Sequence, residues 1–287
     1  MTTILLITVG GSPQPILTSI QSLQRDRTIF ICSGGSRGSI SQVTGEGKPC
    51  QVRRGAAVVS ELPNIPTQLG LGDRFNPKTD VVLLDNPDDL AECYQRISAA
   101  VMVLRRDSDS PGIYADYTGG TKTMSLALGA VAIDYGLTLY LTTSTTRENL
   151  IKVERGESTE RASTTMVMVE RTLNQMLPLF LQQYNYPAAI AQLQNLLQAA
   201  ELPSDMKRRI KALRDGCAAF DAWDRFDHAQ AWRLLEPQMQ LLQAWGLCLK
   251  KVMHSRAMLD QDFEAIASIP GHGYEVVQDL LLNAERR

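Results

Sequence analysis

The chain has 287 residues, of which 44% are hydrophobic and 21% are charged, so it is not a disordered tail, a collagen-like repeat or a disulfide-rich mini-protein. This length suggests about two domains. The 29 basic and 31 acidic residues give a net charge of −2, so bulk binding of nucleic acid through clustered positive charge is not expected.

The sequence shows no sign of a membrane segment, a secretory signal or a cysteine-based metal site. No apolar run reaches the roughly 18 residues of a membrane span, so no membrane partner is expected. The start, MTTILLITVGGS, has no basic region before its apolar run, which is unlike a secretory signal. The 5 cysteines are scattered and form no CxxC pair, so neither a disulfide framework nor a zinc site is indicated. We expect a reducing, cytoplasmic location and no bound metal.

The first half alternates short apolar runs with helical stretches. The predicted strands are Ile4–Val9, Thr28–Cys32, Asp80–Leu84, Ile113–Asp116 and Leu137–Thr143. The predicted helices are Pro13–Arg25 with Ser12 as N-cap, Asp88–Arg106, and Thr121–Tyr135. This alternation predicts right-handed βαβ units and a Rossmann-like, mostly parallel sheet. Residues 34–79 are rich in glycine and proline and receive no assignment, and Ile151–Arg155 with Ser163–Glu170 is expected to form a closing hairpin.

The pattern changes near Arg171, after which helices alone are expected. They are Arg171–Gln183, Ala188–Ala200, Asp205–Trp223, His228–Leu249 and Tyr274–Arg287. The fold class is therefore α/β, with a Rossmann-like domain over residues 1–170 followed by an all-α domain over residues 171–287. The last residues carry no glycine or proline stop signal, so this domain either frays at a natural end or continues beyond residue 287.

Two loops that follow predicted strands combine glycines with a helix start. Residues 8–13 (TVGGSP) contain Gly10 and Gly11, which form either a plain tight turn or a close approach to an anion. Residues 116–124 (DYTGGTKTM) add hydroxyls and Lys122 in the first helical turn. The positive end of the helix dipole disfavours a cation at this position, unless an anion lies between the lysine and the helix amides. Lys122 therefore either contacts an anionic ligand or simply extends into solvent.

Neither loop matches a standard nucleotide motif. The second loop lacks the first glycine and the G-K order of a Walker A sequence, and GxGxxG is absent, so no cofactor is predicted. Two further strand ends carry small residues, and one of them an arginine. These residues either contact a ligand or are ordinary polar loop residues. They are Ser33, Gly34, Ser36 and Arg37 after the second strand, and Thr143 after the fifth.

The pairing of TVGGSPQPI with DYTGGTKTM resembles the CARF family, the Rossmann-fold sensors of type III CRISPR antiviral defence, over about residues 1–170. The resemblance implies a homodimer that binds a cyclic oligoadenylate second messenger, a tetra- or hexa-adenylate, in a two-fold cleft. The ligand-binding residues that it implies, together with the other strand-end candidates, are Thr8, Gly10, Gly11, Ser12, Ser33, Gly34, Ser36, Arg37, Asp116, Thr118, Gly119, Gly120, Thr121, Lys122 and Thr143.

The helical half resembles the linker of CARF-type ribonuclease effectors around residues 223–229 (WDRFDHA), a stretch that also reads as a packing corner between helices. The HEPN ribonuclease motif, R-x(4–6)-H, is absent: there are 3 histidines, and Arg225 precedes His228 by too few residues. A basic run, Lys207 to Arg214, is interpreted as a solvated helix face.

Some relatives cleave their own ring by attack of a ribose 2′-OH on the adjacent phosphate. Lys122, Ser12 and Thr118 are the candidate residues for such chemistry here, which requires positioning and charge stabilisation but no metal. No histidine lies within residues 1–227, so histidine acid–base catalysis in this half is excluded.

Three functions thus remain open. The first is a cyclic oligoadenylate sensor, with or without ring-nuclease activity. The second is a regulatory CARF-type protein whose helical half binds DNA or a partner. The third is a small-molecule α/β enzyme that uses a nucleotide.

Overall fold

The computed structural model describes residues 2–35, 38–54, 57–106, 112–148, 152–198, 202–259 and 273–286. Contacts within the chain divide it into two compact units, Met1–Thr164 and Thr165–Arg287. Among the described residues, none of the helices combines the length and the apolar composition of a membrane span.

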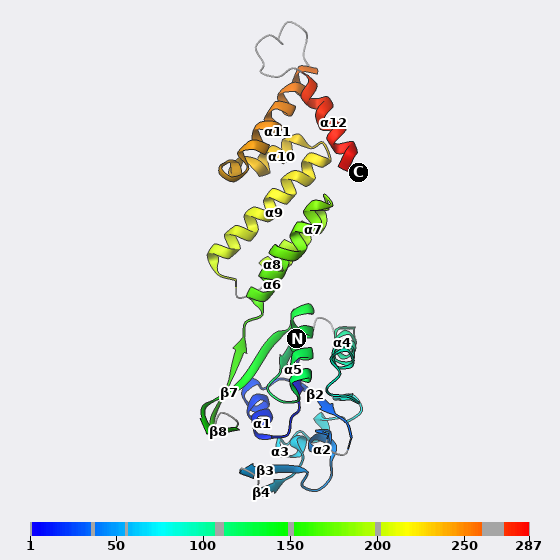
Figure 1. The fold of residues 1–287 in the computed structure, drawn as a ribbon, viewed down its shortest axis with the longest axis vertical. Coiled ribbons are helices and arrows are strands. Elements are labelled where there is room, and N and C mark those ends of the chain that lie inside the picture. The colour runs from blue at the N-terminus through cyan, green and yellow to red at the C-terminus, as the bar shows by residue number, and fades with distance from the viewer. Residues whose placement is uncertain are drawn as a thin grey trace. The chain divides into compact units, whose positions relative to one another are not determined.

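A six-stranded sheet with the order β5-β2-β1-β6-β7-β8 forms the centre of the first unit (Figure 1). Its strands are β1 (Thr3–Thr8), β2 (Arg27–Ser33), β5 (Val81–Leu84), β6 (Gly112–Asp116), β7 (Thr138–Glu148) and β8 (Lys152–Ala162). Neighbouring strands from β5 to β7 are parallel, and β8 is antiparallel to β7. The predicted α/β class, with a mostly parallel Rossmann-like sheet, is confirmed.

Helices cover both faces of this sheet, which explains why the central strands β1 and β2 are buried along nearly their whole length. Helices α4 (Leu90–Arg106) and α5 (Lys122–Asp134) share one hydrophobic cluster with Ile4 and Leu6 of β1. Helix α1 (Gln14–Leu23) shares the cluster on the other face with Leu5 and Ile7. Burying each such side chain contributes about 1.5–3 kcal/mol relative to exposure.

The described residues between 34 and 79 form only short elements. They are α2 (Ser41–Thr44), β3 (Cys50–Arg54), β4 (Ala57–Leu62), α3 (Ile65–Gln68) and a single 3₁₀ turn, Gly72–Arg74. Strands β3 and β4 form a separate antiparallel pair. Val43, Cys50 and Ile65 are fully buried and extend the cluster under α1. Elements this short carry too little periodicity for assignment from sequence.

Two sequence predictions in this part of the chain are wrong. Pro13, not Ser12, is the N-cap of α1, and its ring offers no side-chain cap. The predicted hairpin partner Ser163–Glu170 is not a strand, because residues from Thr165 form helix α6 and the hairpin partner of β8 is β7. Val169 shows the reason: it is fully buried in the helical core of the second unit, so tertiary packing overrides its β propensity.

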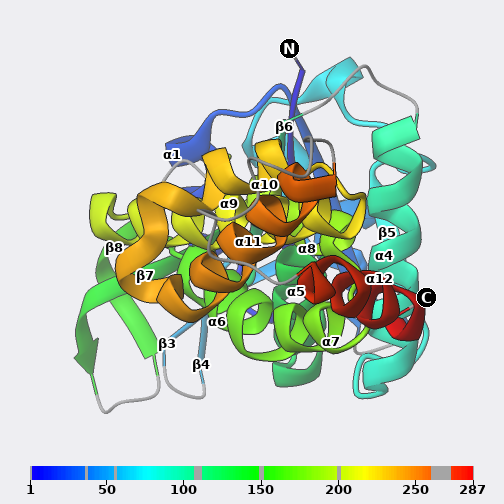
Figure 2. The ribbon, with the colours of Figure 1, turned by 90° about the horizontal axis from the view of Figure 1, so that it is seen from above.

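The described part of the second unit is helical throughout. Its helices are α6 (Thr165–Arg171), a π-helical turn (Thr172–Met176), α7 (Leu177–Gln182), α8 (Tyr186–Leu197), α9 (Ser204–Asp224), α10 (His228–Leu235), a 3₁₀ turn (Glu236–Gln238), α11 (Met239–Leu259) and α12 (Tyr274–Arg286). Helices α9, α10 and α11 pack against one another (Figure 2). The single helix predicted over His228–Leu249 is wrong, because Pro237 cannot continue a helix and separates α10 from α11.

Residues 223–229 form the corner between α9 and α10. Phe226 turns the chain with a left-handed φ of 61°. The indole Nε1 of Trp223 donates to Asp279 on α12 at 2.7 Å, and His228 Nε2 lies 3.0 Å from the other oxygen of the same carboxylate. This polar contact holds α12 against the corner.

Candidate functional site

The two glycine-rich loops meet at the switch point of the sheet. From β1 the chain leads to β2 and β5 on one side, whereas β6 lies directly on the other side of β1. Because these strands are parallel, the loops after Thr8 and Asp116 emerge at the same edge. Open α/β sheets bind ligands at such a point, outside the carboxyl ends of the strands.

The two loops touch through their backbones. A Cβ added to Gly10 would lie 2.6 Å from the amide nitrogen of Gly120, and one added to Gly119 would lie 2.3 Å from the carbonyl oxygen of Thr8. Gly120 also has a left-handed φ of 83°, which strains any other residue. The glycines are therefore needed for this contact, whereas a Cβ on Gly11 would meet nothing within 4 Å.

Buried polar groups beneath the exposed surface of the two loops stabilise the contact. The Thr8 hydroxyl donates to the carbonyl oxygen of Gly119 at 2.7 Å. The Asp116 carboxylate accepts from the Ser19 hydroxyl of α1 at 2.5 Å and from the amide of Thr118 at 2.8 Å. Thr8 and Asp116 are fully buried, so they position the loops and do not face solvent. Burial raises the pKa of Asp116, and the bonds from Ser19 and Thr118 only partly oppose it.

Threonines fix the rest of the second loop. The amide of Thr142 in β7 donates to the hydroxyl oxygen of Thr118 at 2.6 Å. Thr121 is the N-cap of α5, since its hydroxyl oxygen accepts from the amide of Met124 at 3.2 Å. The same hydroxyl donates to the carbonyl oxygen of Pro87 at 2.7 Å, which ties the loop to the segment before α4.

Several groups that could contact a ligand lie on the exposed side of the two loops. Gly11, Ser12, Gly120 and Lys122 are exposed. Among the described residues, Lys122 has no ion-pair or hydrogen-bond partner for its ammonium group. A free cation and loop amides thus lie at one surface, an arrangement suited to an anion with several oxygens.

The two helix starts differ in what they offer. Helix α5 has no proline in its first turn, so its first amides point out of the helix end. Helix α1 has prolines at positions 13 and 15, which removes two of its donors. The start of α5 is therefore the stronger anion-binding end.

The third predicted loop reaches this site only indirectly. Ser33 and Ser39 exchange hydrogen bonds between amide and hydroxyl groups at 2.9 and 3.0 Å, and the amide of Gly34 donates to Leu84. Helix α2 follows, and its Gln42 donates from Nε2 to the carbonyl oxygen of Gly10 at 2.6 Å. Ser36 and Arg37 lie outside the described residues.

Thr143 is placed differently from the prediction. Strand β7 continues to Glu148, so Thr143 lies within the strand and not in a loop after it. The neighbouring Thr142 is buried, and its hydroxyl lies 3.4 Å from the carboxylate of Asp116. Alternating strand side chains point to opposite faces, so Thr143 points away from Asp116. The predicted strand end is too early because pairing with β8 extends β7 to Glu148.

Sequence reasoning missed two residues that build the site, namely Ser19 and Gln42. Ser19 is a buried hydroxyl on the apolar face of α1, and a serine facing a core is the one local signal that was available. Gln42 comes from the unassigned segment. Their partners lie far away in sequence, so only the fold reveals these contacts.

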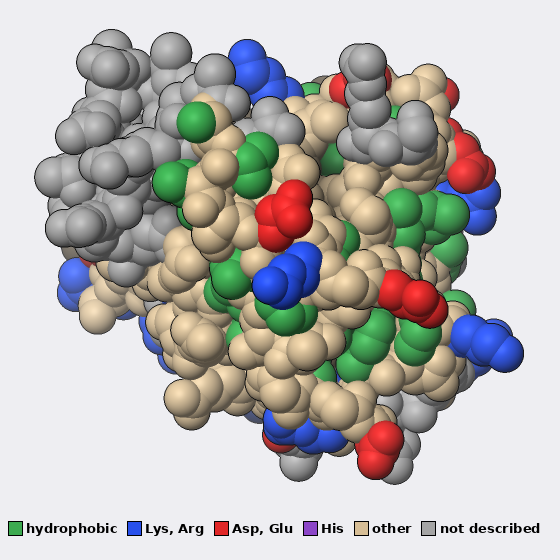
Figure 3. Space-filling model, turned by 90° about the horizontal axis from the view of Figure 1, so that it is seen from below, with side chains coloured by type: hydrophobic (Ala, Val, Ile, Leu, Met, Phe, Trp, Pro, Cys, Tyr) green, Lys and Arg blue, Asp and Glu red, His purple; other side chains and the backbone are tan. Residues whose placement is uncertain are grey.

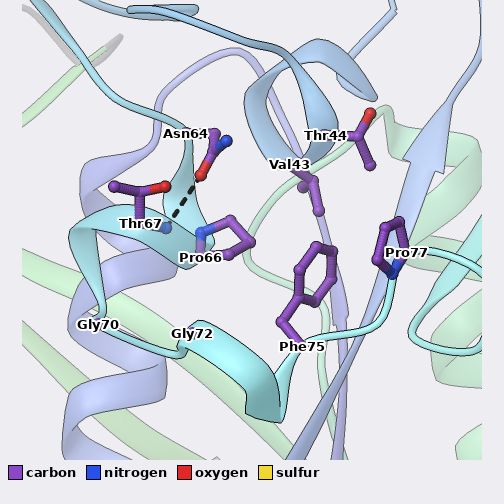
Figure 4. A pocket seen from close by; sticks show the side chains of 9 residues that line it. All are labelled: Val43, Thr44, Asn64, Pro66, Thr67, Gly70, Gly72, Phe75 and Pro77. Carbon is purple, nitrogen blue, oxygen red and sulfur yellow. Dashed lines mark hydrogen bonds between the residues drawn. The ribbon is translucent and has the colours of Figure 1, made fainter.

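A pocket of about 470 Å³ lies away from these loops, in the segment between β2 and β5 (Figure 4). It is lined by Val43, Thr44, Asn64, Pro66, Thr67, Gly70, Gly72, Phe75 and Pro77. The side chain of Asn64 is already used, because it accepts from Thr67 and donates to Gly45, both at 2.9 Å. The pocket contains none of the predicted site residues and no charged side chain, so the strand-end loops remain the candidate site.

The surface shows neither a concentrated charge on the face in Figure 3 nor, among the described residues, a cluster of metal ligands. On the face seen in Figure 3, acidic and basic side chains are scattered singly between apolar ones. Within the part of the chain that the structure describes, no group of three or more His, Cys, Asp or Glu side chains could hold a metal ion.

Comparison with known proteins identifies the fold. No protein-family model and no curated protein matches the chain. Among solved structures, it is similar to Csm6 of Enterococcus italicus, bound to cyclic hexa-2′-fluoro-hexa-dAMP, with 11% identity, a TM-score of 0.51, and coverage of 90% of this chain and 67% of that one. This likeness shows a shared fold, and it confirms at that level the fold that the resemblance to CARF proteins implied.

Two further matches are weaker. Protein VC1899 from Vibrio cholerae has 11% identity and a TM-score of 0.36, with coverage of 72% of this chain and 54% of its own. Can2 from Sulfobacillus thermosulfidooxidans, in complex with cyclic tetra-adenylate, has 12% identity and a TM-score of 0.34, with coverage of 80% and 68%. With TM-scores below 0.5, neither establishes a shared fold.

The loop contact predicts opposite outcomes at adjacent glycines. Gly10→Ala forces the two backbones apart and should lower the free energy of unfolding by about 1–3 kcal/mol. Gly11→Ala, the matched control, meets nothing and should stay within about 0.5 kcal/mol of the wild type. Urea denaturation measures both, and equal stability of the two variants would show that the loops do not touch.

The burial of Asp116 predicts a pH dependence of stability. Its folded pKa is raised, so the folded state holds the proton more tightly than the unfolded state, and stability is lost as pH rises from the ordinary value of 3.8 through the folded pKa. In Asp116→Asn this loss should vanish, so the stability difference between wild type and variant should fall with rising pH and then level off. Urea titrations between pH 3.5 and 8 test this, and parallel curves would contradict it.

Asp116→Ala separates charge from hydrogen bonding. It leaves the Ser19 hydroxyl and the Thr118 amide without their acceptor, and should cost about 1–3 kcal/mol more than Asp116→Asn at every pH.

Proposed function

We propose that this chain is a CARF-family sensor of type III CRISPR antiviral defence that binds a cyclic oligoadenylate at the loops after β1 and β6. The observation that carries the proposal is the contact between these loops at the switch point. On their exposed side lies the ammonium group of Lys122, which has no partner among the described residues. The protein would act in the cytoplasm and would need no cofactor to bind.

The chemistry of the ligand fits the exposed groups. A cyclic oligoadenylate carries one negative charge at each phosphodiester. Lys122 and the start of α5 offer a cation and amide donors to such a group, and Gly11 and Gly120 allow close approach of the backbone. Ser12 has an exposed hydroxyl that caps no helix, so it is free to contact a ribose or a phosphate.

The shared fold supports the same class of ligand. The Csm6 structure with that fold holds a cyclic hexa-nucleotide analogue. A ring of identical units has rotational symmetry, and an isologous homodimer would present two identical copies of the site to it. The dimer is therefore part of the proposal.

Cleavage of the ring is a second part of the proposal. A ribose 2′-OH would attack the adjacent phosphorus, the bond to the 5′ oxygen would break, and the products would be a 2′,3′-cyclic phosphate and a 5′-hydroxyl. Lys122 would stabilise the charge on the phosphorane. Ser12 and Thr118 would orient the attacking hydroxyl.

Removal of the single charge of Lys122 tests the binding proposal. Lys122→Ala should weaken binding of the preferred ring at least about 10-fold, because a charge-assisted hydrogen bond contributes about 1.5–3 kcal/mol. Lys78→Ala is the matched control, since Lys78 is exposed and precedes β5 at the opposite edge of the sheet. Isothermal titration calorimetry with cyclic tetra- and hexa-adenylate should give one ring per two chains.

Two outcomes would overturn this assignment. If neither ring binds, the proposed function is wrong. If a ring binds but Lys122→Ala and Lys78→Ala behave alike, the ligand lies elsewhere on the chain.

Cleavage is tested separately in EDTA. The purified chain should convert the bound ring slowly to linear products with 2′,3′-cyclic phosphate ends, because positioning without a histidine supports modest rates. Lys122→Ala should abolish this conversion even at saturating ring, whereas Lys78→Ala should retain it. Liquid chromatography with mass spectrometry follows the products, and an intact ring after prolonged incubation would leave a sensor without nuclease activity.

A further inference from the structure

A basic pocket lies in the helical unit, which contributes no residue to the candidate site. Helix α9 and the segment from α10 to the following 3₁₀ turn enclose a volume of about 260 Å³. The pocket is lined by Arg208, Lys211, Ala212, Asp215, Arg233, Leu234, Pro237 and Gln238. Part of the basic run that the sequence assigned to a solvated face thus faces a concave surface.

The positive charge of this pocket is not compensated. Arg208, Lys211 and Arg233 are exposed, and none has an ion-pair or hydrogen-bond partner for its charged group among the described residues. The one acidic lining residue, Asp215, is held by Arg214 at 2.6 Å. The other acids nearest in sequence, Asp205 and Glu236, do not line the pocket.

This arrangement differs from an ordinary solvated helix face in two ways. Arg208 and Lys211 are three residues apart on α9, so their like charges repel each other. Arg233 adds a third cation from α10, on the other side of the pocket. A chain with a net charge of −2 has no general excess of cations that would produce this gathering. An anion in the pocket would relieve the repulsion.

We propose that this pocket binds a phosphate group. Guanidinium groups match phosphate oxygens in a bidentate geometry, which Arg208 and Arg233 could each provide, and Lys211 adds a point charge. The volume lies just below the roughly 300–1,000 Å³ of pockets that enclose whole small ligands. It therefore suits a single phosphate group, either free or projecting from a nucleic-acid strand whose remainder lies outside.

Exposed cations beside the pocket bear on the source of the phosphate. Lys207 and Arg209 flank Arg208 on α9 and do not line the pocket. They would meet the neighbouring phosphates of a strand but would be irrelevant to a free phosphate ion. The two sources thus predict different roles for the same pair of residues.

The experiment compares two triple variants of the full chain with the same change in charge. Arg208→Gln/Lys211→Gln/Arg233→Gln removes the pocket cations. Lys48→Gln/Lys78→Gln/Lys251→Gln is the control, since all three lysines are exposed and lie outside the pocket. Circular dichroism and thermal denaturation establish that both variants are folded, which exposed positions should permit. The probes are inorganic phosphate, followed by calorimetry, and a fluorescein-labelled 20-nucleotide single-stranded RNA, followed by anisotropy.

The pocket variant should bind at least one probe 10-fold or more weakly than the wild type, and the control should change less than 2-fold. If the probe is RNA, the slope of log K against log salt should fall by about 2, from three lost contacts at about 0.7 each. Lys207→Gln/Arg209→Gln should then weaken RNA binding and leave phosphate binding unchanged. Absence of binding of both probes to the wild type below 10 mM phosphate and 100 μM RNA, or equal loss in both triple variants, would overturn the proposal.

Discussion

The candidate site depends on one close approach, the backbone contact between the loop after β1 and the loop after β6. Gly10 and Gly119 have no space for a side chain, and the hydroxyl of Thr8 closes the contact through the carbonyl oxygen of Gly119. The contact is possible because β1 and β6 are neighbours in the sheet although more than 100 residues separate Thr8 from Gly119. The position of Lys122 on the exposed side follows from it, since that residue begins the helix that the second loop leads into.

The site has a buried layer and an exposed layer that do different work. The buried layer consists of Thr8, Asp116, Ser19 and Thr142, whose polar groups are used within the protein. A carboxylate in such a place is tolerated because several donors surround it, although burial still raises its pKa. The exposed layer is left free to meet a ligand, and a rigid support of this kind reduces the ordering that binding must impose on the loops.

The polar groups of the helical unit differ in whether they have protein partners. Its polar groups form two kinds of arrangement, one that is satisfied and one that is not. At the corner of α9 and α10, Trp223 and His228 share the carboxylate of Asp279, so every partner is protein. In the pocket between α9 and α10, Arg208, Lys211 and Arg233 have no partner for their charged groups among the residues that the structure describes. Charges that a fold gathers without compensating are better explained by a ligand than by stability.

The sequence by itself determined the class of fold, because a parallel sheet with two covered faces needs continuous apolar strands and regular helices between them. It also determined the two glycine loops, since glycine pairs after strands are a local signal. It could not determine Ser19 or Gln42, whose partners are remote, nor the end of β7, which pairing with β8 extends. Only the tertiary structure decided that the two loops touch and that Asp116 lies buried beneath them, because strand order brings together residues that no local pattern connects.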